Sequence, residues 1–190
     1  MESRHTVESS ACALVLIDLQ EKLAAVMPRR TTVVETAVLL AEVARELDVP
    51  VIVTRQYPQG LGDVVPELAG AVPEQVPVDK VTFCCADEPL FVEKLSATGR
   101  RQVVIAGMET HICVAQTVLA LLAAGHQVFV VADATCSRRD EDHAVALDRL
   151  RAAGAIVATA EAVIYEALGR AGTPEFGRVL RLVKDRAATA

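Results

Sequence analysis

The chain has 190 residues, of which 52% are hydrophobic, and its 25 acidic and 19 basic side chains give a formal net charge of −6. A chain of this length buries roughly 70% of the surface that it exposes when unfolded, so we expect residues 1–190 to form a single domain whose core needs no disulfide or structural metal. The acidic balance and the absence of a long basic run indicate that nucleic acid is not a partner.

Short apolar segments rich in β-branched residues alternate with segments of helical periodicity. Most of these short segments are apolar on both faces, which is typical of strands in a parallel sheet that helices cover on both sides. We therefore expect about six parallel strands, at residues 13–18, 49–54, 76–80, 102–107, 127–133 and 155–159.

Apolar residues recur at helical spacing between these segments and predict helices around residues 34–47, 115–122 and 144–150. Gly125 and Gly154 each follow such a stretch, at the position where a left-handed residue ends a helix. Thr173 before Pro174 predicts the start of a C-terminal helix. Repeated βα units predict a three-layer α/β sandwich, with helices on both faces of the sheet and a ligand site at the carboxyl ends of its strands.

Residues 57–77 form the least regular part of the sequence, with seven Pro and Gly residues in this stretch. We expect a long ordered loop here. Loops of this length within a domain are often functional, so the segment is either a lid over the ligand site or a surface excursion.

The cysteines and the apolar runs bear on the cellular compartment. Five cysteines without a C-x-x-C pair fit reduced thiols better than a disulfide framework. The longest apolar runs have seven residues, far fewer than the roughly 18 that span a bilayer, and the N-terminus lacks the features of a signal peptide. We therefore expect a cytoplasmic protein without a membrane segment.

Three residues with chemically useful side chains lie at predicted strand ends or helix starts. Asp18 closes the first strand, Lys80 closes the third, and Cys113 lies where a loop becomes a helix, a place that lowers the pKa of a thiol. Together they supply a base, a cation and a nucleophile for covalent acyl transfer. Taken singly, Asp18 could be a helix N-cap, Lys80 a solvated surface charge and Cys113 a small buried hydrophobe.

In order and spacing, these residues and their flanking segments resemble the isochorismatase-like cysteine hydrolase superfamily, which includes nicotinamidases and N-carbamoyl amide hydrolases. The resemblance covers nearly the whole chain and rests on the segments ALVLIDLQEKL, PVDKVTFCC, VVIAGMETHICVAQTVLALLAAGHQVFVVADATCSR and ALDRLRAAGAIVATAEAVIYEAL. It implies a six-stranded parallel sheet with the strand order 3-2-1-4-5-6. It also implies that Asp18, Lys80 and Cys113 form a catalytic triad.

The resemblance further implies a non-proline cis peptide between Met108 and Glu109, which would direct the backbone amides of Glu109 and Cys113 at a developing oxyanion. Glu109 departs from the nicotinamidases and is similar to a branch of isochorismatase domain-containing hydrolases whose substrates are mostly unassigned. Its side chain either holds the loop or enters the pocket, and we favour the structural role.

Nicotinamidases bind a metal through a D-x-H motif after the second strand, and this chain departs from that pattern. The corresponding segment reads TRQYPQGLGD and has no histidine. His5, His126 and His143 are placed too far apart to complete a ligand set, and we expect His111 to turn away from Cys113. We therefore predict no catalytic metal and no organic cofactor.

Cys113 distinguishes this chain from isochorismatases proper, which cleave a vinyl ether without a cysteine nucleophile. The resemblance implies hydrolysis of a small amide, ureide or related acyl substrate through a cysteine thioester. Two alternatives stay open: a noncatalytic or thiol-sensing binding protein, in which Cys113, Cys84 and Cys85 serve redox chemistry, and an Asp-driven vinyl ether hydrolase.

Residues that follow the second and third strands are candidates for binding the small-molecule substrate. They are Arg55, Tyr57, Phe83 and Cys84, and we expect their neighbours Gln56 and Cys85 to line the pocket with them. Arg55 could clamp a substrate carboxylate, but an ordinary salt bridge to Asp63 or Glu67 is the use that we favour.

The C-terminal segment raises the question of assembly. Phe176, Val179, Leu180 and Val183 lie on one face of the predicted helix, and Tyr165 and Leu168 precede them. This face must be covered, either within the monomer or by another copy. The family resemblance implies multimeric assembly, so we expect a homo-oligomer.

Overall fold

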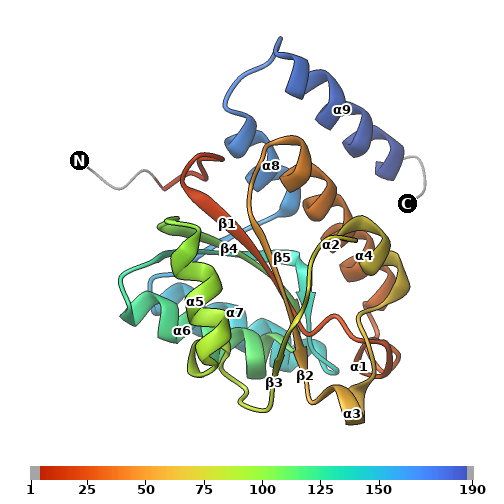
Figure 1. Cartoon of the computed structure of the whole chain (residues 1–190), viewed down its shortest axis with the longest axis vertical. Helices are drawn as coiled ribbons and strands as arrows, with labels where there is room; N and C mark the ends of the chain where they lie inside the picture. Colours follow the sequence, from red (N-terminus) through yellow and green to blue (C-terminus); the bar gives the residue numbers. More distant parts are fainter. Residues whose placement is uncertain (1–4, 188–190) are drawn as a thin grey trace.

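The computed structural model describes residues 5–187 and contains a six-stranded parallel sheet with the strand order β3-β2-β1-β4-β5-β6 (Figure 1). The predicted fold class and strand order are confirmed. The strands are β1 (Cys12–Ile17), β2 (Val51–Gln56), β3 (Val78–Lys80), β4 (Gln102–Met108), β5 (Gln127–Cys136) and β6 (Ile156–Ala158).

The central strands show why these sequences form a sheet that is buried on both faces. All residues of β1 and β4 are buried. Leu14 and Leu16 of β1 belong to one hydrophobic cluster, whereas Val15 and Ile17 belong to the cluster on the opposite face. Since neighbouring side chains on a strand point to opposite faces, a continuous apolar run supplies both cores at once.

The helices cover the two faces of the sheet, as predicted (Figure 1). One core receives buried residues from α2, α4, α8 and α9, and the other receives them from α5, α6 and α7. The helical segments are α1 (Glu21–Ala24), α2 (Arg30–Glu46), α3 (Pro58–Leu61), α4 (Pro66–Ala71), the 3-10 turn η1 (Cys85–Asp87), α5 (Pro89–Ala97), the π-helical turn η2 (Thr110–Val114), α6 (Ala115–Ala123), α7 (Asp140–Ala152), α8 (Ala160–Leu168) and α9 (Pro174–Ala187).

The helix boundaries follow the sequence signals. Gly125 and Gly154 have φ angles of 88° and 103° just after α6 and α7, and α9 begins at Pro174 with the Thr173 hydroxyl accepting a hydrogen bond from the Phe176 amide at 3.1 Å. Among the described residues, no helix has the length and apolarity needed to cross a membrane.

The segment 57–77 is more regular than a loop. Pro58 and Pro66 each occupy the first turn of a short helix, where a missing amide hydrogen costs nothing, so two of the prolines that suggested a long loop start α3 and α4 instead. The segment is also held to the start of α1, because the Glu21 amide donates to the Asp63 carbonyl and the Val65 amide donates to the Leu19 carbonyl, both at 2.9 Å. The segment 57–77 is therefore an ordered surface segment that backbone hydrogen bonds hold in place on both sides of Val64.

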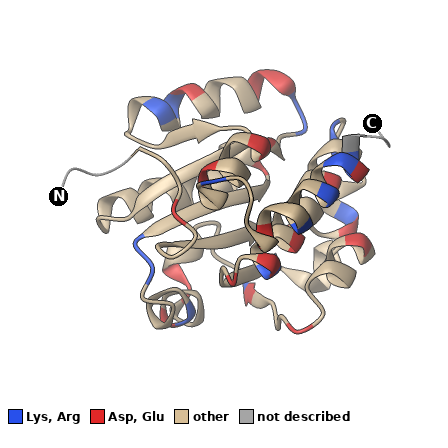
Figure 2. Cartoon of the chain, turned by 90° about the horizontal axis from the view of Figure 1, so that it is seen from above, with Lys and Arg blue, Asp and Glu red and all other residues tan. Residues whose placement is uncertain are grey.

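Charged residues lie mostly on the helices and loops, and few of them lie on the strands (Figure 2). Asp18, which directly follows β1, and Lys80, the last residue of β3, are both buried. Because a buried charge is costly unless it is paired and hydrogen-bonded, these two residues direct attention to the carboxyl edge of the sheet.

Gly107 allows β1 and β4 to approach each other beside this edge. It pairs with Ile17 and has a φ of 138°, and a Cβ atom at this position would lie 2.0 Å from the Ile17 carbonyl oxygen. We expect Gly107→Ala to lower the free energy of unfolding by roughly 2–4 kcal/mol in urea denaturation. Gly177→Ala in α9 is the control, because space is open there and a helical alanine stabilises by about 0.5–1 kcal/mol. Equal effects of the two substitutions would contradict this account.

Candidate active site

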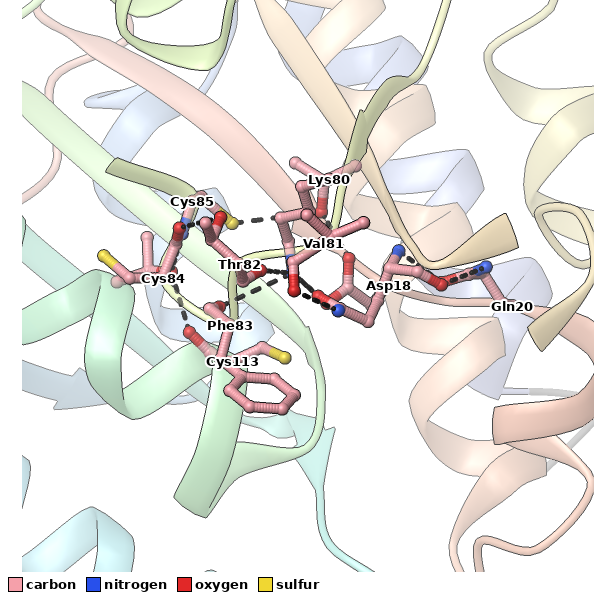
Figure 3. A network of polar contacts seen from close by, with 12 residues as sticks. Asp18, Gln20, Lys80, Val81, Thr82, Phe83, Cys84, Cys85 and Cys113 are labelled. Carbon is pink, nitrogen blue, oxygen red and sulfur yellow. Dashed lines mark hydrogen bonds and ion pairs between the residues drawn. The ribbon is translucent and has the colours of Figure 1, made fainter. Parts of the chain in front are cut away.

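Asp18, Lys80 and Cys113 meet at the carboxyl edge of the sheet (Figure 3). The Lys80 Nζ atom lies 2.7 Å from Asp18 Oδ2, and both side chains are fully buried. Cys113 lies in η2, directly before α6, and its thiol interacts electrostatically with both Asp18 and Lys80. The structure therefore brings together the three residues that the sequence singled out.

Asp18 has a left-handed backbone, with φ of 54°, and its carboxylate points into the site. Its Oδ1 atom accepts a hydrogen bond from the Thr54 hydroxyl at 2.7 Å, and its Oδ2 atom accepts one from Lys80. The alternative in which Asp18 caps the following helix is wrong, since the N-cap position of α1 belongs to Gln20 and has no side-chain cap.

Lys80 is not a surface charge. Its ammonium donates to Asp18, to Gln56 Oε1 at 2.6 Å and to the Thr82 carbonyl at 3.3 Å, and it lies 3.5 Å from the Phe83 carbonyl. Burial lowers the pKa of Lys80, but the negative charge of Asp18 is the largest of the opposing effects, and the net shift is upward. Lys80 is therefore held as a cation.

The Cys113 thiol differs from the sequence-based expectation. Burial, and next the negative charge of Asp18, raise its pKa, and the opposing effect of Lys80 is smaller. The expected lowering at a helix start is therefore wrong for the resting protein, because desolvation outweighs the helix terminus. Burial and the charge of Asp18 therefore favour the protonated form of the thiol, and the Asp18 carboxylate lies beside it.

The loop before Cys113 contains the predicted cis peptide bond between Met108 and Glu109. The Glu109 carboxylate is buried and accepts hydrogen bonds from the Arg138 amide at 2.9 Å and from Arg138 Nε at 3.1 Å. The Glu109 side chain thus fastens this loop to the segment after β5, which is the structural role that we favoured. The assignment of the Glu109 and Cys113 amides as oxyanion donors stays a prediction.

The four candidate substrate-binding residues have different environments. Tyr57 and Phe83 are each 54% exposed, whereas Cys84 is buried and directs its thiol to the Gln116 carbonyl at 3.7 Å. The Arg55 guanidinium is engaged by Asp79 at 2.7 and 3.0 Å and by Asp63 at 2.8 Å. Asp63 was one of the two expected partners, and Asp79 was not anticipated. Substrate contacts by these four residues stay predictions.

The histidines near the site are bonded to other residues. His111 Nδ1 lies 2.9 Å from the Ser137 hydroxyl, and His143 Nδ1 lies 2.9 Å from the Thr110 hydroxyl. Within residues 5–187, no group of three or more His, Cys, Asp or Glu side chains is arranged to hold a metal ion.

Two polar residues of β2 belong to the site. Gln56 was expected to line the pocket, whereas Thr54 was not predicted as a functional residue. Thr54 contacts Asp18 and Gln56 contacts Lys80, and both side chains are buried. The available signal for Thr54 was its spacing from Gln56: the two are polar residues two apart at the end of an apolar strand, so they share a face of the sheet.

All five cysteines are free thiols, and burial raises the pKa of each; it reaches about 11 for Cys12 and about 12 for Cys85 and Cys136. The folded protein therefore keeps protons that the unfolded chain loses above about pH 8.5. Because the native state then binds more protons, stability must fall as the pH rises, by about 1.4 kcal/mol per pH unit for each buried thiol.

We expect urea denaturation to show a much lower free energy of unfolding at about pH 10 than at about pH 8. Cys12→Ala serves as the matched variant, because it removes one titrating thiol outside the candidate site and should make the decline less steep. A free energy of unfolding that is independent of pH over this range would contradict the prediction.

The sheet order, the surrounding helices and the edge cluster define an α/β protein with the isochorismatase-like fold. The isochorismatase domain model matches residues 12–162, so the chain belongs to the isochorismatase family, whose members are hydrolases. It is 44% identical over 173 residues to isochorismatase domain-containing protein 2 from Bos taurus, covering 90% of this chain and 82% of that protein.

Two solved structures are also similar. MAR1 ribonuclease from Caenorhabditis elegans has a TM-score of 0.89 and 36% identity, and the match covers 94% of this chain and 92% of that one. YcaC from Pseudomonas aeruginosa, determined with hexane-2,5-diol and covalent acrylamide, has a TM-score of 0.86 and 28% identity, with coverage of 95% and 92%.

Proposed function

We propose that this protein hydrolyses a small amide, ureide or related acyl substrate, with Cys113 as nucleophile, Asp18 as proton acceptor and Lys80 as the fixed cation. The observation that carries the proposal is the fully buried ion pair at 2.7 Å between Lys80 and Asp18, placed beside the Cys113 thiol. A buried pair of this kind adds little stability by itself, so its position next to a nucleophile favours a catalytic use.

The first half of the reaction forms a thioester. Asp18 takes the thiol proton, and the Cys113 sulfur attacks the substrate carbonyl carbon to form a C–S bond. The resulting oxyanion is held by the backbone amides of Glu109 and Cys113. When the C–N bond breaks, Asp18 returns its proton to the departing amine or ammonia.

The second half regenerates the enzyme. Asp18 takes a proton from water, the hydroxide attacks the thioester carbon, and the C–S bond breaks. The thiolate recovers the proton from Asp18, and the carboxylic acid leaves. Each cycle consumes one water, and Lys80 keeps its proton and stabilises the negative charge that passes between Asp18 and Cys113.

The two alternative functions make different demands on Cys113. Vinyl ether hydrolysis needs Asp18 but no thiol, and a thiol sensor needs an oxidant but no acyl substrate. The related YcaC structure contains covalent acrylamide, an electrophile that nucleophiles attack at its alkene carbon, which supports a reactive nucleophile in a protein of this fold.

A hydrolysis screen tests the proposal. The wild type and Cys113→Ala are compared on small carboxamides, ureides and carbamoyl amino acids, with isochorismate and an RNA oligonucleotide as further arms and EDTA in a parallel set. We expect release of amine or ammonia from one of the acyl substrates by the wild type alone, unchanged by EDTA. Cleavage confined to isochorismate or RNA would refute the proposal, and loss with EDTA followed by recovery with zinc would refute its metal-free mechanism.

We also propose that the protein assembles as a homo-oligomer, although not chiefly through the C-terminal helix. Val179 is fully buried, and Leu168 and Val183 pack against the core, so much of the apolar face of α9 is covered within the monomer. Large apolar side chains are exposed elsewhere: Val81 at 73%, Phe83 at 54% and Leu90 at 45%. Such residues support an interface between copies.

Light scattering coupled to size exclusion at micromolar concentration checks this assembly. The 20.2 kDa chain should elute with a mass that is a multiple of this value. A mass near that of one chain would contradict the oligomer.

A further inference from the structure

Gln56, the last residue of β2, occupies a defined place behind the ion pair. Its Oε1 atom accepts a hydrogen bond of 2.6 Å from Lys80 Nζ, and the side chain is buried. None of the reaction steps proposed for Cys113, Asp18 and Lys80 uses Gln56. Nevertheless, its contact with Lys80 is as short as the contact between Lys80 and Asp18.

The orientation of the Gln56 side chain is fixed by its other bonds. The Nε2 atom donates to the Val81 carbonyl at 3.0 Å, so the oxygen of the amide must face Lys80. The backbone of Gln56 is held as well, because its amide donates to Gln20 Oε1 at 2.7 Å and its carbonyl accepts from Gln20 Nε2 at 3.1 Å. Gln20 is fully buried and is therefore a rigid support.

Gln56 also completes the set of acceptors around the ammonium. Lys80 has three N–H donors, and its acceptors are Asp18, Gln56 and the carbonyls that follow β3, at the longer distances of 3.3 and 3.5 Å. Removing Gln56 Oε1 would leave a buried ammonium with only one short bond. The cation would then be less firmly held beside Asp18 and less stable in its charged form.

We propose that Gln56 is a positioning residue that, with Gln20 behind it, holds the Lys80 ammonium against Asp18 and thereby sets the pH at which Cys113 becomes a nucleophile. The proposal rests on the function proposed above for Cys113. It assigns Gln56 no contact with the substrate.

The pH dependence follows from the groups around Cys113. These are Asp18 at the end of β1, whose negative charge opposes the thiolate, Lys80 on β3, whose positive charge favours it, and the thiol of Cys85 in η1, whose own pKa is raised by burial. Gln56 holds the Lys80 ammonium, whose positive charge favours the Cys113 thiolate, in place. Loss of Gln56 must therefore raise the apparent pKa of Cys113 nucleophilicity.

The test uses the full chain and needs no knowledge of the substrate. The rate of Cys113 alkylation by iodoacetamide is measured across pH, with peptide mass spectrometry separating Cys113 from the other four cysteines. Gln56→Met removes both polar atoms, and Gln56→Asn keeps an amide that is one carbon too short to reach Lys80. The control is Gln102→Met, which removes another buried glutamine at the opposite end of the sheet, bonded to Glu8 and Gln127.

We expect both Gln56 variants to shift the apparent pKa upward by about one unit, which is about a tenfold lower rate below that pKa, and Gln102→Met to leave the profile unchanged. Gln56→Asn carries the test if Gln56→Met does not fold. Profiles that overlay the wild type, with only a loss of stability as in Gln102→Met, would overturn the proposal and leave the proposed function intact. A wild-type Cys113 that is inert at every pH would overturn both.

Discussion

Cys113→Ala and Asp18→Ala should each lower turnover of the true substrate by at least about 10³-fold, because the proposed reaction needs the nucleophile and the proton acceptor in the same cycle. Lys80→Ala should also lower turnover strongly, since the negative charge shared by Asp18 and Cys113 then has no cation beside it. We expect a double variant to lose less turnover than the product of the two single losses, because the three residues act as one unit. Initial rates at saturating substrate for the single and double variants measure this.

Cys12→Ala is the matched control for these substitutions. Cys12 is buried at the start of β1, where its thiol contacts the Ser9 carbonyl, so the variant removes a buried thiol without touching the site. It should keep near wild-type turnover. If Cys113→Ala retained most of the activity, the thioester mechanism would have to be abandoned in favour of Asp-driven ether hydrolysis.

Lys80→Met should lower the free energy of unfolding by about 3–5 kcal/mol, because it leaves the Asp18 carboxylate buried without its counter-charge. The Thr54 hydroxyl would still donate to Asp18, but a hydrogen bond from a neutral donor does not replace the ion pair with Lys80 at 2.7 Å. Urea denaturation at neutral pH measures the loss.

A double-variant cycle separates the ion pair from the general effect of changing a buried lysine. Asp18→Asn with Lys80→Met removes both charges and should be more stable than the sum of the single losses predicts, by about 2 kcal/mol. Arg30→Met is the control, because the Arg30–Glu67 pair at 2.9 Å is solvent-exposed and should cost less than about 1 kcal/mol. A loss for Lys80→Met as small as that for Arg30→Met would contradict a tightly coupled buried pair.

The fold was predictable because its signals are local and repeated. The continuous apolar run of β1 supplies residues to both cores. This run alone indicates a parallel strand that is covered on both faces, even when the neighbouring strands are not known. The helical character of residues 58–61 and 66–71 was not recognised, because proline at the first helical position and proline in a loop look alike in one sequence.

The position of the site at the ends of the strands could be predicted from the sequence, but the pKa shifts of its residues could not. Asp18, Lys80 and Cys113 stand out by residue type, and Gln56 by its place at the end of β2, whereas Thr54 is an ordinary polar residue until the structure shows its contact with Asp18. The sign of the pKa shift at Cys113 depends on burial and on its distance from Asp18, and both are tertiary properties. The sequence alone predicts only that Cys113 lies at the start of a helix.

In the proposed reaction, Cys113 carries the acyl group during turnover. The most direct measurement is rapid acid quenching of the wild type during hydrolysis of a substrate identified in the screen, followed by peptide mass spectrometry. We expect the acyl mass on the peptide that contains Cys113, and its disappearance when the substrate is exhausted. Turnover without any acyl adduct at Cys113, or with an adduct at another residue, would contradict the account.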